Sequence, residues 1–501
     1  MARAAGAVAP ATAPERRVPL IFEESAAGRR GIDLDAGAAS ARRAVEILGA
    51  ELCRETLEGF PEMSEPDVLR HYLRLSQLNF GQALNFYPLG SCTMKHNPVV
   101  NDEVAALAGF AALHPYTPAA LAQGALELIA RLEQALAEIT GMDAVSVHPA
   151  AGAQGELAGL LIVRAWDRRR GGQRRKVIIP DTAHGTNPAS CALAGFAVVV
   201  AKTGPRGYLE AGEIRRLLDD QVAALMVTNP NTLGIFEAEI REIAAALHEC
   251  GALLYLDGAN LNALLGVAKP GHMGADVVHV NLHKTFSTPH GGGGPGAGPI
   301  AVKRALEPFL PAPRLIRVND RWEFDHHRPD AIGKLRAFYG NFGMLVRAYA
   351  YILALGGDGL AAVGPHAILN ANYLRRRLAT NFPAAIDQPA MHECVLAHDL
   401  ERRVKVSTLD LAKRLLDFGI HPPTIYFPLV VSGALMIEPT ETESRETLDH
   451  FAAVMERIYQ EALADPETVK TAPHTTPVAR VDEAAAARKP ILRWTPPQPP
   501  G

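Results

Sequence analysis

The chain has 501 residues, of which 48% are hydrophobic and 21% charged, figures that are typical of a soluble globular protein with two or three domains. The formal net charge of −4 provides no sustained basic face, which argues against nucleic acid as a partner. No apolar run in the sequence approaches the ~20 residues that a membrane-spanning helix needs.

The five cysteines are widely scattered, and no two of them form a CxxC pair. Such spacing favours reduced thiols over a disulfide framework, and it suits the cytoplasm. We predict no metal site. The cysteines are Cys53, Cys92, Cys191, Cys250 and Cys394.

The N-terminal part of the chain is expected to be a tail followed by an arm. Residues 1–18 are small and lack the apolar segment of a signal peptide, so we predict a disordered tail. Residues 19–120 form the arm and its loops, with helical patterns at 41–48 and 65–78 that are too polar to make a core and are expected to pack at a subunit interface. Two loops rich in hydrogen-bonding side chains, 85–98 and 114–118, suit an active site and a surface turn equally well.

Residues 121–330 alternate short apolar runs with amphipathic patterns. Helices are expected at 123–139, from 150 to about 166, at 212–221 and at 237–250. The alternation predicts an α/β fold, a large three-layer domain with a mostly parallel seven-stranded sheet. Its strands are expected at 144–147, 176–180, 196–201, 223–228, 252–257, 277–282 and 299–302.

Residues 150–156 (AAGAQGE) join the first of these strands to a helix. Free backbone N–H groups and the helix dipole make such a turn a site for an anion, such as a cofactor phosphate. A tight turn without any ligand explains the same pattern equally well.

Lys284 follows the strand at 277–282 and precedes the glycine-rich segment 291–299. Burial at a strand end lowers the pKa of an ammonium group and exposes a lone pair that can form a Schiff base with an aldehyde. Asp257 ends another predicted strand, and in a parallel sheet both ends face one ligand-binding edge. Pyridoxal phosphate needs this pair, a lysine for its aldehyde carbon and a carboxylate for its pyridine nitrogen. Taken one at a time, Lys284 can be a lysine in a flexible loop and Asp257 a turn residue.

His184 lies in the loop after the strand at 176–180, at the same edge. Its ring could stack on a pyridine face, although a turn histidine bonded to backbone is the commoner case.

Residues 331–465 are expected to form a smaller α+β domain, and residues 466–501, rich in proline and alanine, a C-terminal tail. In this domain, helices are predicted at 333–355, 360–381, 408–418 and 444–463, and strands at 393–396 and 435–437.

Several long motifs resemble the P-protein of the glycine cleavage system, glycine dehydrogenase (decarboxylating), and in particular the second subunit of its bacterial two-subunit form. The resemblance extends from about residue 18 to residue 460. The motifs that carry it are 87–97 (YPLGSCTMKHN), 183–190 (AHGTNPAS), 257–262 (DGANLN), 281–286 (NLHKTF), 336–343 (RAFYGNFG), 421–427 (HPPTIYF) and 438–443 (EPTETE).

The resemblance implies an aspartate-aminotransferase-like fold, fold type I, with pyridoxal 5'-phosphate as the cofactor. It implies that Lys284 forms the Schiff base, that Asp257 pairs with the pyridine nitrogen and that His184 stacks on the ring. The further cofactor contacts that it implies are Gly152, Ala153, Gln154, Thr228 and Thr285.

The implied reaction is the decarboxylation of glycine, with transfer of the aminomethyl group to the lipoyl group of the carrier H-protein. The implied partners are a first P-protein subunit without the lysine, in an α2β2 heterotetramer, and the lipoylated H-protein. Single-chain relatives have a hydroxyl residue where this chain has Ala151. The phosphate is therefore expected to depend more on backbone amides, on Thr285 or on a neighbouring chain.

Two other hypotheses remain open on the residues alone. Another fold type I enzyme, such as an amino-acid decarboxylase or a cysteine desulfurase, uses the same lysine and aspartate, but the motifs at 87–97 and 421–427 argue against it. A non-catalytic scaffold subunit has no need of Lys284, Asp257 and His184.

Overall fold

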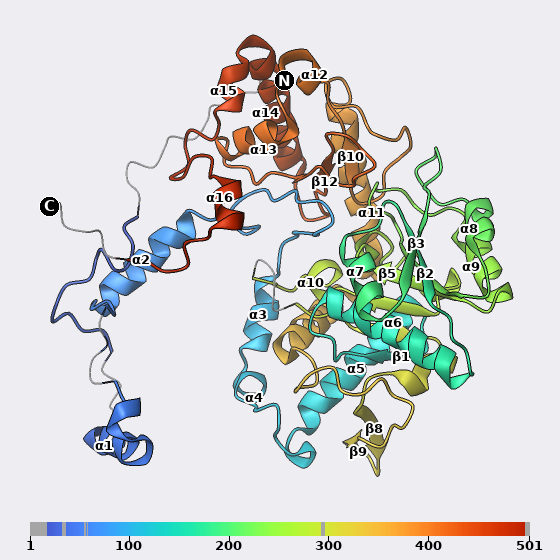
Figure 1. The fold of residues 1–501 in the computed structure, drawn as a ribbon, viewed down its shortest axis with the longest axis horizontal. Coiled ribbons are helices and arrows are strands. Elements are labelled where there is room, and N and C mark those ends of the chain that lie inside the picture. The colour runs from blue at the N-terminus through green and yellow to red at the C-terminus, as the bar shows by residue number, and fades with distance from the viewer. Residues whose placement is uncertain (1–17, 33–36, 55–56, 58, 292–295, 496–501) are drawn as a thin grey trace.

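The computed structural model describes residues 18–32, 37–54, 57, 59–291 and 296–495. They form a large domain around a seven-stranded sheet, a small domain around a three-stranded sheet, and an N-terminal arm whose first two α-helices extend away from both domains (Figure 1). The tail predicted at residues 1–18 lies outside the described residues, except for its last position.

The predicted seven-stranded sheet is confirmed, with strand order β1-β7-β6-β5-β4-β2-β3. Only β7 runs antiparallel to its neighbours, β1 and β6. The central strands are buried along their whole length, as their continuous runs of branched residues require. The strands are β1 (Ala144–Ser146), β2 (Lys176–Pro180), β3 (Ala197–Ala201), β4 (Val222–Thr228), β5 (Leu253–Gly258), β6 (Val277–Val280) and β7 (Ile300–Val302).

Helices cover both faces of the sheet. Leu254 and Leu256 of β5 pack in one hydrophobic core, whereas Leu253 and Tyr255 pack in another, so that two cores sandwich the strands. The predicted helix at 212–221 is shorter in the structure because Asp219 begins a turn, accepting a hydrogen bond from the amide of Gln221. The helices are α5 (Gln123–Thr140), α6 (Gly152–Arg169), α7 (Thr186–Leu193), α8 (Ala211–Leu217) and α9 (Ile240–Glu249), with short turns η3 (Leu261–Ala263), η4 (Pro270–His272) and η5 (Arg304–Phe309).

The long helix α11 (Phe342–Leu378) joins the two domains. It is kinked at Gly356, whose φ of 59° and ψ of −172° are not helical. Among the described residues it is the one helix whose length and composition would allow it to cross a membrane. Its buried side chains pack in both domains, Leu345 in the large core and Leu374 in the small one.

The small domain has the predicted α+β composition. Its antiparallel sheet has the order β10-β12-β11, and a capping box between Ser407 and Asp410 begins the helix that packs beside it. The elements are β10 (Cys394–Leu396), β11 (Thr424–Ile425), β12 (Leu435–Ile437), α12 (Leu400–Val404), α13 (Thr408–Leu416) and α14 (Arg445–Ala464).

The predicted tail at 466–501 is wrong in its first part. Helix α15 (Pro466–Lys470) buries Val469 in the core of the small domain. The backbone amides of His474 and Thr475 then donate to the buried carboxylate of Asp417, which needs such donors. Further on, α16 (Glu483–Arg488) has no buried residue.

The arm exposes apolar side chains, as the interface prediction requires. Its elements are α1 (Gly37–Leu48), η1 (Ala50–Leu52), α2 (Glu65–Gln77), α3 (Val99–Ala105), α4 (Ala108–Ala111) and η2 (Ala119–Leu121). The large exposed side chains between residues 45 and 84 are Val45, Ile47, Leu48, Leu52, Leu57, Phe60, Leu69, Tyr72, Leu73, Leu78 and Leu84.

The sequence interpretation missed a hairpin, β8 (Arg314–Val318) and β9 (Arg321–Asp325). Its two-residue turn, Asn319-Asp320, has φ values of 47° and 63°, and this residue pair is a recognisable hairpin signal. The predicted helix at 333–355 begins only at Phe342.

Candidate active site

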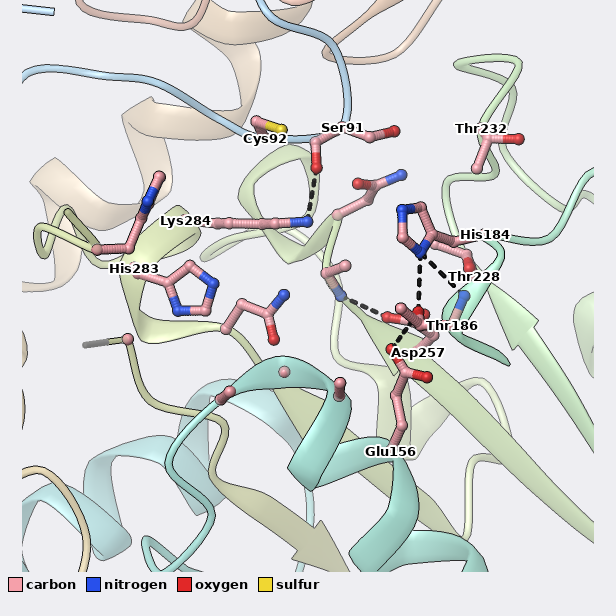
Figure 2. A pocket seen from close by; sticks show the side chains of 18 residues that line it. Ser91, Cys92, Glu156, His184, Thr186, Thr228, Thr232, Asp257, His283 and Lys284 are labelled. Atoms are coloured by element: carbon pink, nitrogen blue, oxygen red, sulfur yellow. Dashed lines mark hydrogen bonds between the residues drawn. The ribbon is translucent and has the colours of Figure 1, made fainter. Parts of the chain in front are cut away.

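A cavity of about 410 Å³ opens at the carboxyl edge of the large sheet (Figure 2). Six of the predicted site residues line it, and Gln154 and Thr285 do not. The six are Lys284, Asp257, His184, Gly152, Ala153 and Thr228.

Lys284 lies on a short helix, α10 (Leu282–Thr285). The sequence predicted instead a strand that extends to Leu282, with Lys284 just beyond its end. Strand β6 ends at Val280, and the helical turn carries the side chain across the sheet edge. The ammonium Nζ donates a hydrogen bond of 2.6 Å to the backbone carbonyl of Ser91, in the loop that closes the other side of the cavity (Figure 2).

Asp257 is the penultimate residue of β5 and is buried, with donors on both carboxylate oxygens. The amide of Ala259 donates to Oδ1 at 2.9 Å, and the side-chain amide of Asn187 donates to Oδ2 at 3.0 Å. Burial alone would raise the pKa of Asp257, but His279, the Ala259 amide, Asn187 and Lys284 together hold this pKa below its ordinary value. The carboxylate is therefore ionised at neutral pH.

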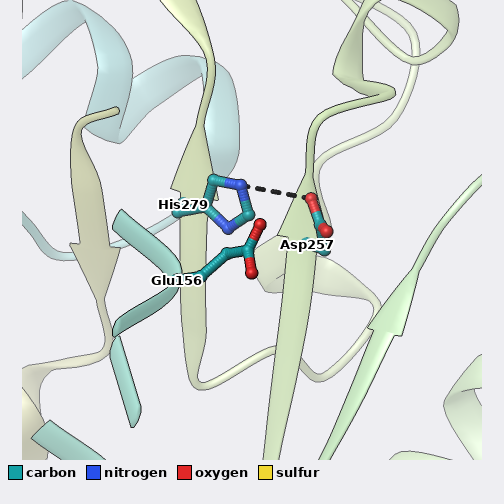
Figure 3. A group of neighbouring side chains, drawn as sticks. All are labelled: Glu156, Asp257 and His279. Carbon is teal, nitrogen blue, oxygen red and sulfur yellow. Dashed lines mark ion pairs between the residues drawn. The ribbon is translucent and has the colours of Figure 1, made fainter. Parts of the chain in front are cut away.

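His279 on β6 is the neighbour of Asp257 that the sequence interpretation missed (Figure 3). Its Nε2 lies 3.2 Å from Oδ1 of Asp257, an ion-pair contact whose angle is too poor for a hydrogen bond. The hydroxyl of Tyr255 lies 3.0 Å from the other ring nitrogen, Nδ1. The signal that could have revealed His279 in the sequence is a histidine within the otherwise mostly apolar run at 277–282.

His184 is exposed at the mouth of the cavity. Its Nδ1 lies 2.8 Å from the hydroxyl of Thr186, and that hydroxyl donates to the buried carboxylate of Glu156 at 2.7 Å. The same carboxylate accepts from Ser190 at 3.0 Å. Glu156, which the sequence interpretation did not single out, thus fixes the turn that carries the imidazole.

The first turn of α6 forms the floor of the cavity at Gly152 and Ala153. Its N-cap residue is Ala151, so no side chain caps the helix and its first N–H groups are free to bind an anion. A Cβ at Gly152 would lie 2.5 Å from Oδ1 of Asn281, so the close approach there requires glycine. Gln154 instead accepts a 2.6 Å hydrogen bond from the Ala150 amide, which removes its side chain from the cavity.

Thr285 is also absent from the lining of the cavity. It is buried, and its carbonyl accepts a hydrogen bond from Lys95, a lysine in motif 87–97. Lys95 in turn forms a 2.7 Å ion pair with Glu441. Burial alone would lower the pKa of Lys95, but Glu441 and Tyr351 raise it, so this buried lysine is a charged structural contact between the loop and both domains.

Two further histidines line the cavity beside Lys284. The rings of His283 and His290 lie 5.6 Å apart. Burial and the charge of Lys284 lower the pKa of His283 to about 3, so its ring is neutral at physiological pH.

Two family models match the chain. One, described as glycine cleavage system P-protein, matches residues 47–323, and the other, glycine dehydrogenase, C-terminal domain, matches residues 363–478. The chain belongs to the glycine cleavage system P-protein family. Within this P-protein family, it is 54% identical over 477 residues to the probable glycine dehydrogenase (decarboxylating) subunit 2 of Caldanaerobacter subterraneus subsp. tengcongensis, covering 95% of this chain and 98% of the relative. The corresponding protein of Listeria innocua is 52% identical, with 96% and 99% covered.

Solved structures of other proteins show the same fold as this chain. An inhibitor-bound glycine decarboxylase (P-protein) matches with a TM-score of 0.71 and 21% identity, over 85% of this chain and 100% of the other. The cysteine desulfurase CsdA of Escherichia coli matches with a TM-score of 0.60 and 14% identity, over 78% and 98%. Likenesses at such identities show the fold alone, so they do not favour the desulfurase hypothesis.

The P-protein cavity has the groups that pyridoxal phosphate needs. Lys284 supplies an amine, Asp257 an ionised carboxylate, and α6 an uncapped N-terminus. Among the described residues, Oγ1 of Thr228 and Oδ1 of Asn281 are buried, belong to residues that line the cavity and have no hydrogen-bond partner within the protein. Buried polar atoms without partners are costly, so these atoms fit a polar ligand.

Proposed function

We propose that this chain is the lysine-bearing subunit of a two-subunit glycine dehydrogenase (decarboxylating). It decarboxylates glycine and transfers the aminomethyl group to the lipoyl group of a carrier H-protein. The observation that carries the proposal is the convergence of Lys284, Asp257 and the uncapped N-terminus of α6 on one cavity, in a chain of the P-protein family.

When bound, pyridoxal phosphate supplies a protonated ring that accepts the electron pair left on the glycine α-carbon after CO2 departs. Lys284 offers its Nζ to the aldehyde carbon of the cofactor. The carboxylate of Asp257 holds the proton on the pyridine nitrogen, which its lowered pKa allows. His184 covers the ring face, and the free N–H groups at Gly152 and Ala153 bind the phosphate. Thr228 is a further cofactor contact.

The site is expected to be completed by a second chain, the first P-protein subunit, in an α2β2 assembly. Ala151 provides no hydroxyl for the phosphate, and neither Gln154 nor Thr285 lines the cavity. The arm, with its exposed apolar side chains, offers the surface on which that subunit can pack. The assembly is placed in the cytoplasm, which suits the five free cysteines.

The test is the glycine-dependent exchange of labelled bicarbonate into the glycine carboxyl group, with lipoylated carrier present. We expect exchange when this chain is mixed with the first subunit, and little exchange from either chain alone. No exchange by the mixture would refute the proposal, and full exchange by this chain alone would refute its two-subunit part.

A further inference from the structure

The loop that bears Ser91 is attached to the small domain, although Lys284 belongs to the large one. Leu89 pairs with Ile437 of β12, and the carbonyl of Gly90 accepts a 2.8 Å hydrogen bond from Thr424 of β11. A Cβ at Gly90 would lie 2.3 Å from the side chain of Met436. Residues 88–93, here called the closing loop, therefore lie directly on the small sheet.

Two buried carboxylates of the small domain hold the closing loop. Glu393 accepts a 2.7 Å hydrogen bond from the amide of Ser91. Glu438 accepts one of 2.9 Å from the amide of Thr93 and another of 2.5 Å from the Thr93 hydroxyl. Both glutamates are completely buried.

The closing loop has a backbone conformation that requires such support. Ser91 and Thr93 have φ values of 60° and 48°, in the left-handed region that is unfavourable for a β-branched residue such as threonine. Strained backbone of this kind persists only where surrounding contacts determine it, and it clusters at functional sites. Here the contacts are the two carboxylates, and the strained residue Ser91 is the one whose carbonyl meets Lys284.

We propose that Glu393 and Glu438 are positioning residues for Lys284, holding the closing loop so that the Ser91 carbonyl accepts the hydrogen bond from the lysine amine. The inference rests on the proposed function for its meaning in catalysis. It links the orientation of the nucleophile in one domain to the packing of the other domain.

The two carboxylates are close enough to affect one another. Burial and the neighbouring charge of Glu438 raise the pKa of Glu393 well above its ordinary value. His392, whose Nε2 lies 3.8 Å from Oε1 of Glu438, is neutral, because burial lowers its pKa.

The experiment measures the acetylation rate of Lys284 by acetic anhydride at pH 7, by mass spectrometry, in the full chain without cofactor. Thr93→Val removes the hydroxyl that donates to Glu438 without changing any charge, and Glu438→Gln weakens the acceptor by replacing one carboxylate oxygen with an amide nitrogen. We expect each change to raise the rate roughly 2- to 10-fold, the range that one hydrogen bond contributes. The double variant should raise it little more than either single variant, because both weaken the same contact.

Asp417→Asn is the matched control, because it alters a buried small-domain carboxylate that does not contact the closing loop. It should leave the rate at Lys284 unchanged, while bicarbonate exchange falls only in the loop variants. Native labelling in Thr93→Val beside altered labelling in Glu438→Gln would overturn the proposal, since charge alone would then act. An equal effect of Asp417→Asn would also overturn it. The labelling needs no glycine chemistry, so it remains interpretable if the proposed function fails.

Discussion

The two domains each contain a buried group of one histidine and two carboxylates, and the pKa of one carboxylate is lowered in the first group and raised in the second. The large-domain group is Glu156, Asp257 and His279 (Figure 3), and the small-domain group is His392, Glu393 and Glu438. In each group, every residue has one side-chain nitrogen or oxygen atom that lies within 4.8 Å of such an atom of the other two residues. Composition and burial are therefore the same in the two places.

The neighbours of each carboxylate decide the direction in which its pKa is shifted. Asp257 has His279, Asn187 and a backbone amide, which outweigh burial and lower its pKa. Glu393 has Ser91 as a donor but faces Glu438, and burial together with that charge raises its pKa. Depth of burial alone thus does not predict whether a carboxylate is ionised.

Lys284 stands between the two groups, so its substitution should have the largest effect. We expect Lys284→Ala and Lys284→Arg to abolish bicarbonate exchange, to below roughly a few per cent, because neither offers a usable amine. The half-buried side chain is not part of the hydrophobic cores, so the thermal unfolding temperature should change little. Exchange above that level in the mixture with the first subunit would contradict the role of Lys284.

Next in size is the neutralisation of Asp257. Asp257→Asn should retain bound cofactor but lose roughly 10²–10³-fold in exchange rate, because an amide cannot hold the pyridinium charge. Asp181→Asn is the control, since Asp181 follows β2 at the same sheet edge but does not line this cavity. A near-native rate for Asp257→Asn would reduce Asp257 to a turn residue.

Removal of His279 tests why the large-domain group is charged. His279→Phe should raise the pKa of Asp257, so that the acid limb of the pH–rate profile moves to higher pH. Because the folded pKa of Asp257 is lowered, its contribution to stability is lost as pH falls through that pKa, and the loss should also begin at higher pH. The rate at neutral pH should fall roughly tenfold. An unchanged acid limb in His279→Phe would contradict the role of His279. As the control, Tyr255→Phe should shift the acid limb less than His279→Phe does.

The smallest effect is expected in the small-domain group. The folded pKa of Glu393 is raised, so its stabilising contribution is present at low pH and is lost as pH rises through that pKa. Glu393→Gln should flatten the fall in the free energy of unfolding as pH rises above the ordinary glutamate pKa, by at least roughly 1 kcal/mol, the equivalent of about one pKa unit, because the amide has no proton to lose. Urea unfolding from acid to neutral pH measures this, and a native slope in the variant would contradict the raised pKa of Glu393.

The sequence by itself determined the alternation of strands and helices and the pair Lys284 and Asp257. Continuous branched runs can be satisfied only in a sheet buried on both faces, and the carboxyl ends of parallel strands share an edge. The motif resemblance led to the family that the comparisons then confirmed.

Only the tertiary structure decided which polar residues meet. Gln154 accepts a hydrogen bond from the Ala150 amide and is absent from the cavity lining, although the resemblance implied that it contacts the cofactor. The contact between Thr93 and Glu438 joins positions 345 residues apart. No local pattern encodes such a contact, because it depends on how the small domain packs against a loop that is distant in the sequence.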